Sequence, residues 1–124
     1  MERRHDVPFR GLVDAVHTTL AAEGFSVADR GQMESVTWVD FQRTTRATID
    51  QPPEEQNLVL YHLGGHDHIG ARLSQYDLLG HMMVPDEASA VWPYEPRTLT
   101  TVAGQPLAHA LLDWLHGRID QRAD

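Results

Sequence analysis

The densest group of metal-ligating side chains is a set of three histidines, His62, His66 and His68, in the segment from 57 to 74. Imidazole is a common zinc ligand, and a zinc ion with an open coordination position can activate water for hydrolysis. The spacing matches no established zinc motif, since it lacks a helical H-E-x-x-H pair and the chain has no cysteine. Zinc binding through His62, His66 and His68 is therefore one hypothesis, and a solvated hairpin tip is the alternative.

Whether these histidines can converge depends on the turn that joins the two strands of the hairpin. Alternate residues of a strand face opposite sides, and directly opposed residues share a side. A two-residue turn at Gly64 and Gly65 would align one apolar row with polar groups, so we predict a loop of three or five residues. That loop places both apolar rows on the core side and lets His62 approach His68 on the other side; the rows are Val59, Tyr61, Leu63 and Ile69, Ala71, Leu73.

A second polar stripe follows helical spacing near the C-terminus. His109, Asp113, His116 and Asp120 recur at steps of four, three and four residues. Such a row could bind a metal ion, but it is more typical of a solvated helix face with weak pairing. We expect the solvated face.

Large apolar side chains suggest a different kind of site. The segment from 82 to 94 combines two methionines, two aromatic residues and prolines, a composition that partner-binding surfaces favour. Trp38 belongs to a strand with apolar residues on both faces, which fits a central strand or one that enters a subunit interface. The candidate binding residues are Trp38, Met82, Met83, Trp92 and Tyr94. The alternative is that Met82, Met83 and Trp92 fill the end of the core.

Composition excludes several classes of chemistry. The chain has no cysteine and no lysine, which removes disulfides, thiol catalysis, Schiff-base chemistry and the phosphate-loop lysine. No nucleophile elbow or dinucleotide fingerprint is present. A formal net charge of −8 opposes binding to phosphate backbones, so we expect no nucleic-acid partner. No apolar run approaches the ~20 residues of a membrane span, so we expect no membrane association and a cytoplasmic location.

The periodicity of apolar residues predicts where the helices and strands lie. Apolar residues at helical spacing predict a helix over 8–23, ended by Gly24, and a second helix that begins at Pro106. Residues 25–27 begin an extended segment that a turn at 29–31 interrupts. A long strand is predicted over 35–49 with a bend near 43–46, followed by a loop over 50–56 and the hairpin. Residues 74–79 fit either a helical turn or a continued strand, 80–97 are irregular, and 97–102 form a last strand.

These elements predict one α+β domain over residues 1–124, with 1–7 frayed. The expected fold is a two-layer sandwich: a mostly antiparallel sheet of four to five strands with an N-terminal and a C-terminal helix. Two amphipathic helices can cover one face of such a sheet, which leaves the face that carries Trp38 to solvent or to another subunit.

Two functions follow as hypotheses. The first is a non-enzymatic protein-binding or assembly domain of the immunity, inhibitor, chaperone or phage-accessory type. It would act without a cofactor, by self-association or on a protein partner, through the uncovered face and residues 82–94. The alternative is a metal-binding protein or metal-dependent hydrolase that holds zinc with His62, His66 and His68.

Overall fold

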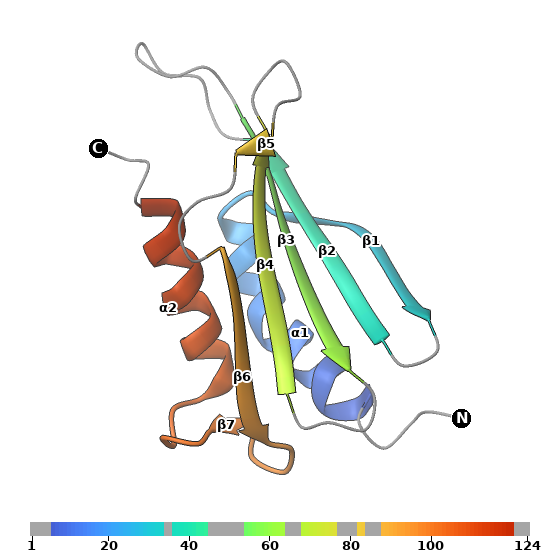
Figure 1. Ribbon diagram of the computed structural model, residues 1–124, viewed down its shortest axis with the longest axis vertical. Helices are drawn as coiled ribbons and strands as arrows, with labels where there is room; N and C mark the ends of the chain where they lie inside the picture. The colour runs from blue at the N-terminus through green and yellow to red at the C-terminus, as the bar shows by residue number, and fades with distance from the viewer. Residues whose placement is uncertain are drawn as a thin grey trace.

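The computed structural model describes residues 6–33, 36–44, 54–63, 68–76, 82–83 and 88–120 (Figure 1). Helix α1 (Asp6–Ala22) comes first and helix α2 (Leu107–Asp120) last; between them lie β1 (Ser26–Met33), β2 (Val36–Thr44), β3 (Glu55–Leu63), β4 (His68–Tyr76), β5 (Met82–Met83), β6 (Ser89–Glu95) and β7 (Thr100–Thr101). The strand order is β1-β2-β3-β4-β6-β7, with β5 paired to β4 off this path. The described strand pairs are all antiparallel. The predicted α+β class and its two terminal helices are confirmed, but the expected four to five strands are too few.

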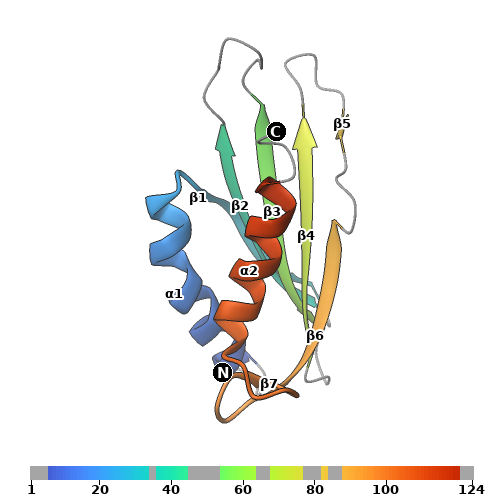
Figure 2. The same ribbon diagram turned by 90° about the vertical axis from the view of Figure 1, so that its left-hand side faces the viewer.

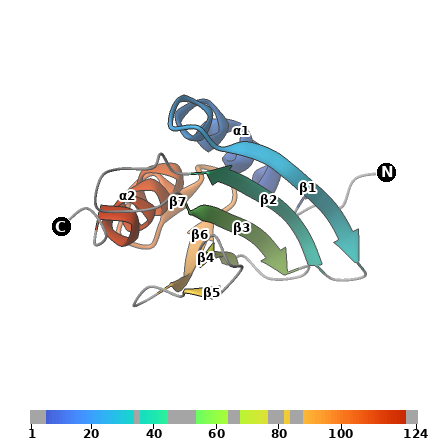
Figure 3. The ribbon, with the colours of Figure 1, turned by 90° about the horizontal axis from the view of Figure 1, so that it is seen from above.

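Both helices lie on the same face of an open sheet (Figures 2 and 3). The apolar stripe of α1 and that of α2 meet the inward residues of the strands, and burial of this apolar surface is the main stabilising term. The largest buried side chains of this core include Phe9, Leu12, Leu20, Phe41, Leu58, Leu60, Ile69, Leu73, Leu107, Leu111 and Leu115. No described element covers the opposite face of the sheet.

Helix α1 ends at a glycine, as the sequence predicts. Gly24 has a φ of 96°, a conformation that residues with a Cβ rarely adopt. The Phe25 N–H donates to the Leu20 carbonyl at 2.9 Å, which satisfies one of the last helical acceptors. Phe25 and Leu20 are both buried, so the cap also turns the chain back into the core.

Arg43 joins the end of α1 to the sheet. Its Nε donates to Gln56 Oε1 at 2.6 Å, and its Nη1 donates to the Glu23 carbonyl at 2.9 Å. The guanidinium also lies 4.5 Å from the centre of the Phe25 ring, a favourable cation–π distance. His116 of α2 reaches the same place, where its Nε2 lies 2.7 Å from Glu23 Oε1. These contacts fix both helices against one end of the sheet.

Several predicted boundaries need correction. The turn expected at 29–31 is part of β1, which pairs with β2 beyond an irregularity between Val27 and Asp29. Pairing of β2 with β3 is regular to Thr44, and the rest of the predicted bend lies outside the described residues. Residues 74–79 were expected to form either a helical turn or a continued strand. Strand β4 continues to Tyr76, so residues 74–76 continue the strand. Only Thr100–Thr101 of the predicted last strand is extended, because 96–99 form a turn.

Strand β6 is the longer of two strands, β5 and β6, that lie in the segment predicted to be irregular. Pro93 lacks a backbone donor and therefore argues against a central strand. In the structure Pro93 lies opposite His68 of β4, while β7 pairs with β6 only at Tyr94 and Glu95. Most of β6 thus has a neighbour on one side, where proline is tolerated.

The predicted odd hairpin loop is wrong. Strand β3 pairs with β4 so that His62 lies opposite Ile69 and Leu60 opposite Ala71, which leaves an even number of residues between opposed positions. The core face therefore carries Leu58, Leu60 and His62, and Val59 and Tyr61 face the other way. Ile69, Ala71 and Leu73 face the core as predicted.

Pairing with β2 explains this register. Residues 58–61 are apolar without interruption, so alternation alone cannot select the buried face. Strand β2 does alternate, and its buried Val39 and Phe41 lie opposite Leu60 and Leu58. Opposed residues share a face, so the side chains of β2 select the leucines of β3 for the core.

A matched pair of histidine substitutions tests the register. We expect His62→Ala to lower the free energy of unfolding by about 2 to 4 kcal/mol, because it removes a fully buried ring. His68→Ala removes an exposed ring and should change it by less than about 0.5 kcal/mol. Urea denaturation of both variants measures the difference, and equal losses would contradict the register.

Candidate functional site

The structure does not bring His62 and His68 together. His62 is 1% exposed and faces the helices, with its ring centroid 6.1 Å from that of Phe9 and 6.4 Å from that of Tyr94. His68 is exposed and has the opposite parity, because its neighbour Ile69 shares the face of His62. His66 lies outside the described residues. The register therefore removes the convergence of His62 and His68 that the zinc hypothesis requires.

The C-terminal polar stripe is engaged in contacts of its own. Asp113 accepts a hydrogen bond from Gln105 Nε2 at 3.2 Å, and His116 contacts Glu23. Within the described ranges, no group of three or more histidine, aspartate or glutamate side chains could hold a metal ion.

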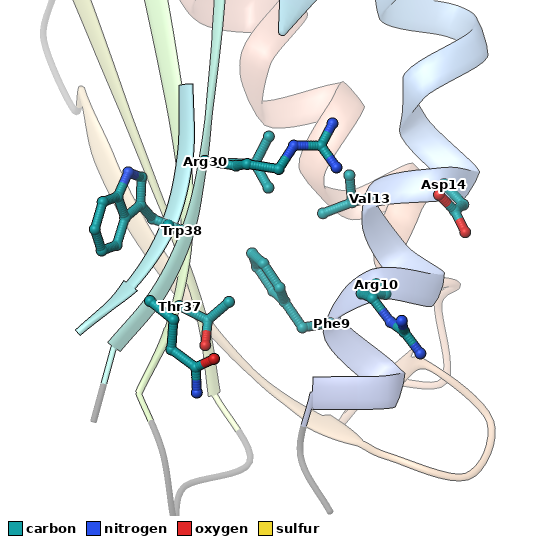
Figure 4. A pocket seen from close by; sticks show the side chains of 10 residues that line it. Phe9, Arg10, Val13, Asp14, Arg30, Thr37 and Trp38 are labelled. Atoms are coloured by element: carbon teal, nitrogen blue, oxygen red, sulfur yellow. The ribbon is translucent and has the colours of Figure 1, made fainter. Parts of the chain in front are cut away.

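The residues predicted to bind a partner divide between the two faces of the sheet. Tyr94 is only 6% exposed and packs in the core, and Trp92 packs edge-on against Trp114 of α2 with ring centroids 5.8 Å apart. Met82 and Met83 form β5 beside the end of β4, and their side chains lie outside the described part of the chain. Among the candidates whose side chains the structure describes, Trp38 is the one on the uncovered face, on the opposite side of the sheet from Phe9 and Val13 (Figure 4).

Trp38 belongs to a row of residues that crosses the uncovered face. Opposed pairs on consecutive strands connect Gly31, Trp38, Tyr61, Gly70 and Val91. A Cβ at Gly31 would lie 2.4 Å from the Trp38 ring, and one at Gly70 would lie 2.1 Å from the Tyr61 ring. Each ring therefore lies across the glycine of a neighbouring strand, an arrangement known as aromatic rescue.

Exposed apolar side chains lie at one end of this row, at Val91, and beside its other end, at Met33. Met33 of β1 is 68% exposed and Val91 of β6 is 56% exposed. Together with Trp38 and Tyr61 they form a flat apolar surface across the sheet, which we call the aromatic platform (Met33, Trp38, Tyr61 and Val91). Exposed apolar surfaces of this kind mark interaction sites more often than isolated apolar side chains do.

Acidic side chains flank the aromatic platform on the same face. Asp29 lies directly opposite Asp40, and Asp40 lies opposite Val59. Burial raises the pKa of Asp40, the charges of Asp29 and Glu55 raise it further, and a hydrogen bond from Gln42 opposes the increase. The uncovered face therefore combines an apolar centre with the three carboxylates of Asp29, Asp40 and Glu55, and Arg72, opposite Val59, is a positive charge on the same face.

Two glycines carried the signal that the sequence analysis missed. Gly31 and Gly70 stand inside segments that form strands, and a glycine inside a strand often marks the close approach of another group. Their partners Trp38 and Tyr61 become visible only when the strand register is known.

The fold and this face define the chain as an open α+β domain with one sheet face covered by helices and the other exposed. No protein-family model, curated protein or solved structure matches the chain. Among the described helices, none has the length and apolar character needed to cross a membrane.

A double-mutant cycle tests the contact between Tyr61 and Gly70. Gly70→Ala should displace the ring, so we expect Tyr61→Ala to destabilise the chain more with Gly70 present than with alanine there. The coupling should be about 0.5 to 1 kcal/mol, as for cross-strand aromatic pairs. Denaturation of the four proteins measures it, and additive effects would show that the ring does not rest on Gly70.

The pKa of Asp40 predicts a pH-dependent effect of Asp40→Asn. A raised folded-state pKa means that the ionised carboxyl destabilises the folded chain, and that this penalty is lost as the pH falls to the ordinary value of 3.8 and below. We expect Asp40→Asn to raise the free energy of unfolding at neutral pH by less than about 1 kcal/mol, since solvent screens a partly exposed group.

The control is Asp14→Asn, at an exposed position on α1. Thermal unfolding of both variants at neutral and acidic pH should show a gain for Asp40→Asn alone, and the gain should disappear in acid. A gain that persists in acid would contradict the electrostatic cause.

Proposed function

We propose that this chain is a non-enzymatic protein-binding domain that docks a partner protein on the aromatic platform. The observation that carries the proposal is the row of two aromatic rings and two exposed apolar side chains on the uncovered face. Tryptophan and tyrosine supply large contact areas at a small loss of conformational entropy and are enriched among the residues that dominate binding energy. A flat sheet face suits a flat partner surface.

Charge supports a basic partner. Asp29, Asp40 and Glu55 lie on this face, and the chain carries a formal net charge of −8. Among the described residues, Asp40 Oδ1 and Asn57 Oδ1 are shielded from solvent and have no hydrogen-bond donor. Arginine side chains of a partner could pair with the exposed carboxylates of Asp29 and Glu55 and would lower the repulsion among the carboxylates.

The same charges disfavour a second copy of the chain as the occupant. Two copies face to face would bring together two groups of carboxylates in a region of reduced dielectric constant, where like charges repel strongly. We therefore propose a different protein, with an apolar surface bordered by arginine or lysine.

Photo-crosslinking followed by binding measurements tests this proposal. A photoreactive benzoylphenylalanine in place of Tyr61 should crosslink a partner in native cells, while the same group at exposed His109 of α2 should not. Mass spectrometry identifies the partner, which is then purified. Calorimetry should show that Val91→Asp weakens binding by about tenfold or more, because it places a charge in the apolar contact.

Val102→Asp is the matched control, since Val102 is 84% exposed, lies after β7 and is not one of the four platform residues. It should leave the affinity within about twofold, in line with the small effects of substitutions outside an interface. Raising the salt concentration should weaken binding, as expected for attraction between opposite charges. Equal effects of the two valine substitutions would overturn the proposal. A dimer of this chain that Val91→Asp dissociates would instead identify a second copy as the occupant.

A further inference from the structure

A cavity of about 340 Å³ lies on the helix side of the sheet, between α1 and the first two strands (Figure 4). Its lining includes Phe9, Arg10 and Val13 of α1, Arg30 of β1, and Thr37 and Val39 of β2. This volume is at the lower end of the range found for small-molecule sites. Gly31 and Trp38, which belong to the row on the uncovered face, also border the cavity.

The cavity has an apolar base and a cationic rim. Phe9 and Val39 are buried, and Val13 is half-buried, so their side chains offer an apolar wall. The guanidinium of Arg30 extends from β1 toward α1 above Val13 (Figure 4), and the lining also includes Asp14 of α1. The Arg30 side chain makes no hydrogen bond or ion pair with any described residue.

The register of β1 places Arg30 there. After the irregularity that follows Val27, Arg30 lies opposite Val39 and shares its inward face. Arg30 itself is exposed to solvent, and its side chain extends over apolar residues on the core side of this edge strand.

We propose that this cavity binds a small monocarboxylic acid with an apolar body. The apolar body would contact Phe9, Val13 and Val39, and the carboxylate would accept hydrogen bonds from Arg30. A planar guanidinium matches a carboxylate with two parallel hydrogen bonds, which fixes the orientation of the ligand.

An added strand from another protein fits this site less well. Strand β1 is at the edge of the sheet, where an extended peptide could pair. The Arg30 N–H, however, already donates to Asp29 Oδ1 at 2.9 Å. The Asp29 carboxylate thus occupies a backbone donor in the middle of β1, which protects this edge of the sheet against pairing with another strand. We therefore assign the cavity to a small molecule.

Titration with linear fatty acids tests the proposal. Hexanoate, octanoate and decanoate, each below its micelle-forming concentration, are added to the ¹⁵N-labelled chain and followed by NMR. We expect saturable shifts of the Val13 and Val39 amide signals and an affinity that rises about threefold for each added methylene group that is buried. Arg30→Gln should weaken octanoate binding about threefold, as for a partly exposed ion pair.

The controls separate charge from apolar burial. Arg72→Gln removes an exposed arginine on the opposite face and should leave octanoate binding unchanged, and Arg30→Gln should leave the binding of 1-octanol unchanged. The octyltrimethylammonium cation should bind more weakly than octanoate. The proposal is overturned by signals that do not move, by equal binding of the cation, or by octanoate binding that Arg30→Gln does not weaken. None of these results depends on the protein partner of the aromatic platform.

Discussion

One strand register runs through β2, β3 and β4, and the rest of the structure depends on it. It places Phe41 opposite Leu58, and Leu58 opposite Leu73, so that three neighbouring strands present buried apolar residues to the two helices. A shift of β3 by one residue would exchange its two faces, because side chains alternate along a strand. This pairing therefore determines which residues form each face of the sheet.

The register gives the two faces different chemistry. On the helix side, His62 packs between the rings of Phe9 and Tyr94 and belongs to the core. On the other side, Trp38 and Tyr61 rest on Gly31 and Gly70, which lack the side chains that would occupy that space. Glycine weakens a strand, and the ring that lies across it restores the lost packing. The same glycines therefore account for the flat surface that we propose as a docking site.

Strands β1 and β2 contribute alternate residues to two separate sites. Gly31 and Trp38 face outward to the platform, whereas Arg30, Thr37 and Val39 face inward to the cavity beside α1. An apolar surface with acidic neighbours suits a basic protein, and a small pocket with an apolar wall and two arginines suits a small acid. Alternate residues of two neighbouring strands thus face the two sites, and Gly31 and Trp38 border both of them.

The sequence by itself determined the elements whose signal is local. Helical periodicity located both helices, and Gly24 marked the end of the first. Alternation along β2 placed Val39 and Phe41 on the opposite face from Trp38. These features depend on neighbours within a few residues along the chain, so the pattern carries them. The α+β class and the uncovered face followed from the same information.

Only the tertiary structure decided which face of β3 is buried and which side chains meet. Residues 58–61 are apolar on both faces, so pairing with β2 had to choose between them. That choice separated His62 from His68, directed Tyr61 outward and brought its ring onto Gly70. The packing of Trp92 against Trp114 likewise joins segments distant in sequence. Contacts of this kind are set by pairing between strands and by packing between layers, which periodicity along a single strand does not encode.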